Sequence, residues 1–332
     1  MKAIATSILP GQITIEEKEK PILTKGEVLI EVAYCGICGS DIHAAKHSKG
    51  YEFVERGTTL GHEISGRVVK VFDEKDEHLV NKKVIIESMH YCGVCENCQL
   101  GRYSICSYLQ VIGLHFNGGM TQFLKVKSDF VQEIDARLPI DIAALAEPMS
   151  IAVHAVKKIN ELGASNTVLV QGPGIIGYFI GLICAHKKAD VILSGLENDY
   201  AYRLSKAAVF KMKPFIADKE ILETKVDYIF ECSGSSAALK SGFRYLKKGG
   251  KVVVVALYEQ ETTLFLNDLV RNEWPLITSY GCNPDDYRDA SEILIHYKEE
   301  LRKIISYFPL IEAERAFKES MNQKVLKAVL YK

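Results

Sequence analysis

Four cysteines lie close together in the segment CGVCENCQLGRYSIC, with the spacing C-x2-C-x2-C-x7-C: Cys92, Cys95, Cys98 and Cys106. Four thiolates suit a closed, tetrahedral structural zinc site, which leaves no coordination position open for chemistry. The bacterial iron–sulfur run has a last gap of three residues, which differs from the gap of seven here. Disulfides are the other alternative. The spacing therefore predicts a structural zinc ion.

A second set of metal-binding residue types is spread along the chain. Cys38 lies in CGICGSDIH, His62 and Glu63 in LGHEISGRVV, and Glu147 in LAEPMSIAVHA. A lone cysteine is usually a core residue and His-Glu pairs occur by chance, so the argument depends on the combination. One thiolate, one imidazole and one or two carboxylates suit a zinc ion that keeps a position for water or substrate.

A glycine motif, G-x-G-x-x-G, follows a short apolar run at residues 167–170 and precedes an apolar helical stretch at 175–186. Glycines at these spacings permit a tight turn, close approach of a pyrophosphate and close helix–strand packing. The free N–H groups at the start of the helix then attract the phosphates. This context predicts a dinucleotide site formed by Gly172, Gly174, Ile175, Ile176 and Gly177.

The elements around these residues fall into two kinds. Residues 28–33, 65–71 and 83–87 are short β-branched runs separated by turns, which indicates a β-rich first part. From about residue 167 onward, short apolar runs alternate with helical stretches, which predicts a parallel, doubly wound sheet in an α/β protein. We expect the chain to leave that sheet after Trp274-Pro275 and to form helices near 285–297 and 313–322.

Size and charge limit the class of protein. A chain of 332 residues is long enough for two domains, and its net charge of −1 gives no reason to expect nucleic acid or an anionic membrane as a partner. The amino terminus has no long apolar stretch, so we expect neither a signal peptide nor a membrane span. Nine cysteines without such a signal indicate a reducing, cytoplasmic location.

Taken in order, these motifs resemble the zinc-containing medium-chain alcohol dehydrogenases, in particular the polyol branch that includes sorbitol dehydrogenase. The resemblance runs nearly end to end. It rests on GICGSDIH (36–43), GHE (61–63) with Gly66, the four-cysteine segment, LAEP (145–148), GPGIIG (172–177) and KGGK (248–251).

The resemblance implies a fold, a domain division and an assembly. A GroES-like β-rich catalytic domain is expected at 1–147 and 276–332, because the tail returns to it in this family, and a Rossmann domain at 148–275. Members pair through edge strands of the nucleotide-binding sheet, for which residues 252–257 and 262–266 are candidates. A homo-dimer or homo-tetramer is therefore expected.

The resemblance also implies a reaction, which is hydride transfer between a polyol or other secondary alcohol and a nicotinamide cofactor. Cys38, His62 and Glu63 match the ligands of a catalytic zinc that acts as a Lewis acid on the substrate oxygen, while the carboxylate matching Glu147 binds directly or through water. Ser40 and His43 match the positions of a proton relay, and Asp41 is expected to orient His62.

The choice between NAD and NADP stays open in the sequence. The strand-end position that normally carries an acid for the NAD ribose is held by Gly195. A small residue there often accompanies NADP, yet no basic side chain follows until Arg203, and Glu197 is a candidate replacement acid. The sequence leans slightly to NAD.

The substrate cannot be named from the sequence. Ala44 and Ser279 stand where sorbitol dehydrogenases place a tyrosine and an arginine, and Glu147-Pro148 differs from the Asp-Pro common in threonine dehydrogenases. An L-threonine 3-dehydrogenase and a cofactor-binding regulatory protein without turnover are the competing hypotheses.

Overall fold

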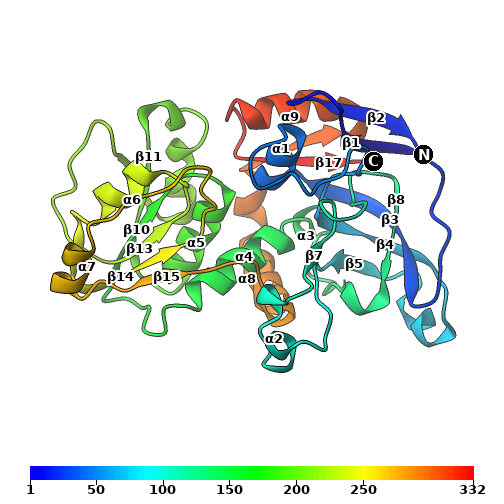
Figure 1. The fold of residues 1–332 in the computed structure, drawn as a ribbon, viewed down its shortest axis with the longest axis horizontal. Coiled ribbons are helices and arrows are strands. Elements are labelled where there is room, and N and C mark those ends of the chain that lie inside the picture. Colours follow the sequence, from blue (N-terminus) through cyan, green and yellow to red (C-terminus); the bar gives the residue numbers. More distant parts are fainter. The chain divides into compact units, whose positions relative to one another are not determined.

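The computed structural model describes all residues from 1 to 332, and the chain divides into two compact units (Figure 1). Unit 1 consists of Met1–Ser150 and Cys282–Lys332, and unit 2 of Ile151–Gly281. Helix α4 (Ala146–Val156) contains the first boundary. No helix has both the length and the apolar character that crossing a membrane requires.

Unit 1 contains a seven-stranded sheet with the order β16-β17-β3-β4-β5-β9, and β8 also pairs with β3. In chain order, the strands are β3 (Glu27–Gly36), β4 (Glu63–Val71), β5 (Lys83–Ile86), β8 (Phe123–Lys127), β9 (Val131–Glu133), β16 (Ile305–Pro309) and β17 (Lys327–Tyr331). β17 runs antiparallel to β3, with Leu330 opposite Cys35, so both ends of the chain build this sheet.

Alternation of side chains explains the central strand β3. Val28, Ile30 and Val32 are buried in the main hydrophobic core of unit 1, as the period of two in a strand requires. The β-branched runs expected at 28–33 and 65–71 lie in β3 and β4, and the run expected at 83–87 matches β5 except for its last residue.

Shorter elements surround this sheet in unit 1. Two small antiparallel pairs are formed by β1 (Lys2–Thr6) with β2 (Ile13–Glu17) and by β6 (Met89–His90) with β7 (Gln110–Val111). The other helices are α1 (Gly39–Ala45), α2 (Glu96–Gln99), α3 (Ile140–Ala143), α8 (Pro284–Arg302) and α9 (Ala313–Met321). The last two include the helices expected near 285–297 and 313–322.

Unit 2 is a six-stranded sheet in which every paired strand is parallel, with the order β12-β11-β10-β13-β14-β15. Its elements are β10 (Thr167–Gln171), α5 (Ile175–His186), β11 (Asp190–Gly195), β12 (Lys213–Ile216), β13 (Val226–Glu231), α6 (Ser236–Gly242), β14 (Leu246–Val254), α7 (Leu266–Asn272) and β15 (Leu276–Thr278). The strand order reverses direction beside β10, which is the switch point where such sheets bind ligands at their carboxyl ends.

The far side of this sheet differs from the expectation. β15 (Leu276–Thr278) still pairs with β14, so unit 2 runs on to Gly281 rather than ending at Pro275. β14 is an interior strand between β13 and β15, and residues 262–266 form no strand. The edge on this side is therefore β15, not either of the segments proposed from the sequence.

Candidate functional site

The backbone of unit 1 brings Cys38, His62 and Glu63 together. Cys38 immediately precedes α1, while His62 and Glu63 stand at the start of β4, whose first residue is paired with Gly36 of β3. The ligand atoms of the three residues all lie within 4.8 Å of one another. The predicted three-residue set is thus one cluster in space.

Two glycines shape the backbone beside this cluster. A Cβ on Gly36 would lie 1.8 Å from Glu63 Oε2, so any side chain there would displace the carboxylate. Gly61 has a φ of +96°, and a Cβ on it would lie 2.6 Å from Cys35 Sγ. Gly36 therefore makes room for the Glu63 carboxylate, and Gly61 provides the positive φ and close packing of the loop that leads to His62.

Asp41 holds the loops that carry the cluster. It is fully buried, and its carboxylate accepts hydrogen bonds from Cys38 N (2.9 Å) and Gly61 N (3.1 Å). Asp41 Oδ1 lies 3.6 Å from His62 Nδ1, and Ser40 Oγ lies 3.3 Å from His62 Nε2. Burial disfavours the imidazolium, but the negative groups Asp41 and Cys38 outweigh burial and raise the pKa of His62 well above its usual value.

A buried lysine also belongs to the cluster, and we did not predict it from the sequence. Lys327, the first residue of β17, is 1% exposed, forms an ion pair with the Glu63 carboxylate and donates to Ile37 O at 2.9 Å. Burial disfavours its charge, but Glu63 and Cys38 outweigh burial and raise the pKa of Lys327. In the sequence Lys327 resembles any strand-end lysine, and only the register of β17 against β3 shows its role.

Glu147 lies beside the cluster rather than within the group of three. Its Oε1 accepts a hydrogen bond from Ser88 Oγ at 2.8 Å, and Ser88 in turn is bonded to the hydroxyl of Tyr287. Burial raises the pKa of Glu147 to about 6, although the His62 charge opposes this shift. Ser88 and Tyr287 were not predicted, because only the fold brings residues 199 positions apart together.

The donor set fits a zinc ion. Thiolate, imidazole and carboxylate are the ligand types of catalytic zinc sites with one open position. Glu63 Oε1 is buried without any hydrogen-bond partner, which is costly unless a cation compensates it.

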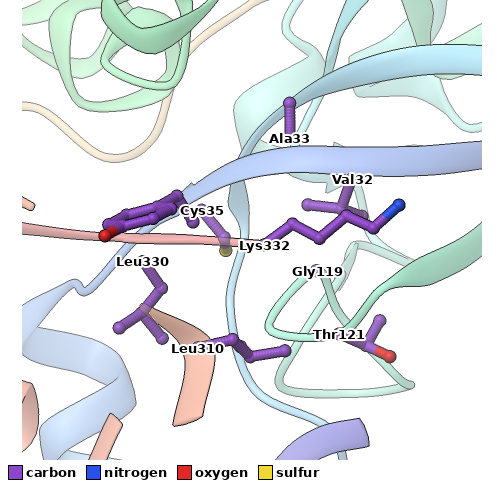
Figure 2. Close-up of a pocket in the computed structure, with 9 residues that line it drawn as sticks. Val32, Ala33, Cys35, Gly119, Thr121, Leu310, Leu330 and Lys332 are labelled. Atoms are coloured by element: carbon purple, nitrogen blue, oxygen red, sulfur yellow. The ribbon is translucent and has the colours of Figure 1, made fainter. Parts of the chain in front are cut away.

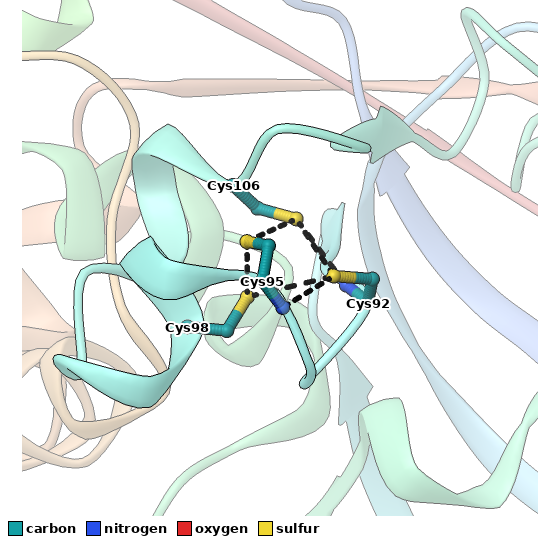
Figure 3. A group of neighbouring side chains, drawn as sticks. All are labelled: Cys92, Cys95, Cys98 and Cys106. Atoms are coloured by element: carbon teal, nitrogen blue, oxygen red, sulfur yellow. Dashed lines mark hydrogen bonds between the residues drawn. The ribbon is translucent and has the colours of Figure 1, made fainter.

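The four-cysteine segment forms a second cluster (Figure 3). The Sγ atom of Cys95 lies 3.5 Å from the Sγ of Cys98 and 3.8 Å from that of Cys106. The Sγ atom of Cys92 lies 3.6 Å from the Sγ of Cys106 and 4.0 Å from that of Cys98. Sulfurs about 2.3 Å from a tetrahedral zinc would be about 3.8 Å apart. Disulfide sulfurs are separated by only about 2.05 Å, and all nine cysteines are free.

Backbone N–H groups support these thiolates. Cys95 N donates to Cys92 Sγ, and Cys92 N and Tyr108 N both donate to Cys106 Sγ, each at 3.3 Å. Hydrogen bonds from the backbone of Cys98 and Ser107 lower the pKa of Cys95 to about 6. These bonds favour the thiolate of Cys95, the form in which cysteine binds metal, whereas burial raises the pKa of Cys98 to about 12.

Ser40 and His43 both lie on α1, three residues apart and thus on one face of the helix. His43 Nδ1 is 3.3 Å from Ser48 Oγ, and its ring stacks on Tyr51 with centroids 5.4 Å apart. The imidazole therefore has a fixed orientation one helical turn from the cluster.

The glycine motif has the backbone geometry that a dinucleotide site needs. Gly172 has a φ of +101°, and a Cβ there would lie 2.9 Å from the backbone of Ser233. No atom lies within 4 Å of the position that a Cβ on Gly174, just before α5, would take, so a ligand can approach the backbone there. A Cβ on Gly177 would meet Gly172 O at 2.1 Å, so this glycine permits close packing of helix and turn.

A small pocket elsewhere in unit 1 carries no such chemistry (Figure 2). It is lined mainly by side chains from β3 and β17 and the segment around Gly119, including Val32 and Leu330. No cluster of metal-binding residues lies in it.

Comparison with known families identifies the class of protein. The family described as alcohol dehydrogenase GroES-like domain matches residues 24–136, and the family described as zinc-binding dehydrogenase matches residues 175–296. The chain therefore belongs to the zinc-binding alcohol dehydrogenases and is an oxidoreductase that acts on a CH–OH group. The predicted fold class, a GroES-like β-rich domain with a Rossmann domain, is confirmed.

Individual relatives agree with this assignment. The chain is 30% identical to D-arabitol-phosphate dehydrogenase of Enterococcus avium, covering 97% of this chain and 95% of that protein. It is 28% identical to sorbitol dehydrogenase of Halalkalibacterium halodurans, covering 99% of each. A crystal structure described as a short chain alcohol dehydrogenase from Escherichia coli CFT073, complexed with NADH, shares the fold, with a TM-score of 0.89, 21% identity and coverage of 100% and 99%. The predicted membership of a zinc-type family with polyol dehydrogenases among its members is confirmed.

Proposed function

We propose that this chain oxidises a secondary alcohol of a polyol or polyol phosphate, or reduces the matching ketone, with a nicotinamide dinucleotide. The observation that supports the proposal best is the buried cluster of Cys38, His62 and Glu63 in a chain that also has a well-formed glycine motif. Relatives that act on sorbitol and D-arabitol phosphate suggest the class of substrate.

Each chain would hold two zinc ions. Cys38, His62 and Glu63 would hold the catalytic ion, and Glu147 would reach it through a water molecule, because it lies outside the group of three and is bonded to Ser88. Cys92, Cys95, Cys98 and Cys106 would hold the structural ion. A catalytic zinc supplies a Lewis acid for the alcohol oxygen, and the nicotinamide accepts the hydride.

The chain's own residues would remove the proton that accompanies hydride loss. Ser40 Oγ lies beside the metal cluster and would accept the proton of the alcohol, and His43, one turn further along α1, would carry it toward solvent. Asp41 would keep His62 in place by bonding both loops that flank it. The products are a ketone, a reduced cofactor and one proton.

The dinucleotide would bind at the carboxyl ends of β10 and β11. Gly172, Gly174 and Gly177 would form the turn, and the backbone N–H groups of Ile175 and Ile176 at the start of α5 would face the pyrophosphate. NAD fits better than NADP, because the residues that follow Gly195 include the acids Glu197 and Asp199 and no basic side chain before Arg203.

The direct test is nicotinamide absorbance during incubation of the zinc-loaded protein with polyols, polyol phosphates, diols, sugar acids and threonine, each with NAD and with NADP. Turnover of a polyol or its phosphate is the expected result. Turnover of threonine above all polyols, or binding of NADH without any turnover, would contradict the proposal.

A further inference from the structure

The end of β11 lies next to the glycine turn of the dinucleotide motif. β11 runs parallel to β10, and Gly172 N donates to Ser194 O at 2.9 Å. In Rossmann sheets the acidic residue at this strand end accepts hydrogen bonds from the ribose hydroxyls of the adenosine half. Here the position is held by Gly195, which has no side chain to accept them.

Pro173 explains why Gly195 cannot be an acid. A Cβ on residue 195 would lie 2.7 Å from Pro173 Cγ and 3.1 Å from Pro173 Cδ. A proline ring cannot move away as a flexible side chain could, since it is closed onto the backbone. Pro173 is the residue between the first two glycines of the motif, so the turn itself excludes a side chain at 195.

A carboxylate from further along the chain occupies the space instead. Asp199 ends the short 3-10 helix Glu197–Asp199, which directly follows the end of β11. Asp199 Oδ2 lies 3.2 Å from the point where a Cβ of residue 195 would be, and it accepts a hydrogen bond from Leu196 N at 2.9 Å. Its other oxygen receives no hydrogen bond from the protein, so it can accept one from a ligand.

The neighbouring acid is engaged elsewhere. Glu197 is 60% exposed and forms an ion pair with Lys219 at 2.9 Å, while its backbone N–H donates to Asp218 Oδ1. Asp199 is half-buried beside the strand end, so it is better placed than Glu197 to meet a ribose. Of the two acids, only Asp199 stands over Gly195.

We propose that Asp199 takes the part of the missing strand-end acid and selects NAD over NADP by accepting the ribose hydroxyls of the adenosine half. This inference rests on the proposed function, because it assigns a role within the same dinucleotide site. A 2′-phosphate in this place would face the Asp199 carboxylate, and like charges repel. Arg203 is the nearby cation that would favour NADP by binding its 2′-phosphate, because the Nε of Arg203 is buried without a hydrogen-bond partner.

The test is fluorescence titration of NADH and NADPH with wild-type protein and the variants Asp199→Asn and Glu197→Gln. Asparagine has the shape of aspartate and can still accept from Leu196 N, so the fold is expected to hold. Losing a charge-assisted hydrogen bond should weaken NADH binding by about tenfold or more, with NADPH binding unchanged or tighter. Glu197→Gln, the matched control, should change the dissociation constant of NADH by less than about twofold, because Glu197 forms only an exposed ion pair.

A triple variant gives an independent reading. Pro173→Ala removes the proline ring, Gly195→Asp places an acid at the strand end, and Asp199→Ala removes the substitute acid. The triple variant should restore the NADH preference that Asp199→Asn loses. Tighter binding of NADPH than NADH by wild-type protein, abolished by Arg203→Gln, would overturn the inference, as would an unchanged preference in Asp199→Asn. In both cases the proposed function stands. Binding of neither nucleotide by wild-type protein would instead overturn the proposed function itself.

Discussion

The two clusters of metal-binding residue types in unit 1 are built in opposite ways. The four cysteines come from one segment of fifteen residues and lie in a loop lobe, with backbone N–H groups directed at the thiolates. The group of Cys38, His62 and Glu63 comes from two separate segments, and a third, the strand of Lys327, supplies its buried counter-charge. The first cluster has only thiolates, whereas the second mixes ligand types and contains a buried, unpaired carboxylate oxygen. A local, uniform cluster suits structure, and a non-local, mixed cluster with an open position suits chemistry.

The largest effect should come from the mixed cluster. Cys38→Ser removes its thiolate and should lower kcat by about a thousandfold, because several kcal/mol of transition-state stabilisation depend on the metal. The melting temperature should change little. Coupled absorbance assays and thermal melts measure both quantities, and Cys184→Ala, a buried thiol outside both clusters, is the control. Full activity in Cys38→Ser would show that this cluster is not the catalytic one.

A substitution in the four-cysteine cluster should affect mainly the melting temperature rather than catalysis. Cys98→Ser removes one of its two buried thiolates, and loss of a structural metal should lower the melting temperature by about 10 °C. Catalytic zinc should remain bound in the protein that stays folded. A melt by circular dichroism, with and without added zinc, measures the effect. If Cys98→Ser melted at the wild-type temperature, the structural role of this cluster would be refuted.

The buried ion pair between Lys327 and Glu63 is a further difference between the two clusters. Lys327→Met removes the buried ion pair that Lys327 forms with Glu63 and should reduce the free energy of unfolding by about 3 kcal/mol. Lys332→Met is the matched control on the same end of the chain, because Lys332 pairs with Glu31 at the surface, and it should cost less than about 1 kcal/mol. Equal effects in urea unfolding of the two variants would argue against a special role for Lys327.

Asp41 should have the smallest effect of the four. Asp41→Asn keeps the shape of the side chain and weakens its bonds to the loops around His62, so zinc affinity at the mixed cluster should fall by about 10-fold to 100-fold. The four-cysteine cluster should keep its affinity. Competition with a zinc chelator of known affinity resolves the two sites, and parallel losses at both would contradict the distinction between them.

The sequence could predict the features that are formed within one segment, but not those that depend on contacts between distant segments. The four-cysteine lobe, the glycine motif and most strands are local patterns, so their residues could be named directly. Lys327, Ser88 and Tyr287 could not, since only strand register and packing bring them to the cluster. At the end of β11 the sequence showed that Gly195 lacks an acid, but it suggested Glu197 as the substitute. The clash between a Cβ at 195 and Pro173, and the return of Asp199, depend on distances that no local pattern contains.

Counting zinc in three proteins tests the central claim most directly. Native mass spectrometry of the wild type, Cys38→Ser and Cys98→Ser, with activity measured on the same samples, should give two, one and one zinc ions per chain. Only Cys38→Ser should combine an intact fold with lost turnover. A wild-type protein with a single zinc, or Cys38→Ser that retains two ions and full turnover, would contradict the division into a structural and a catalytic site.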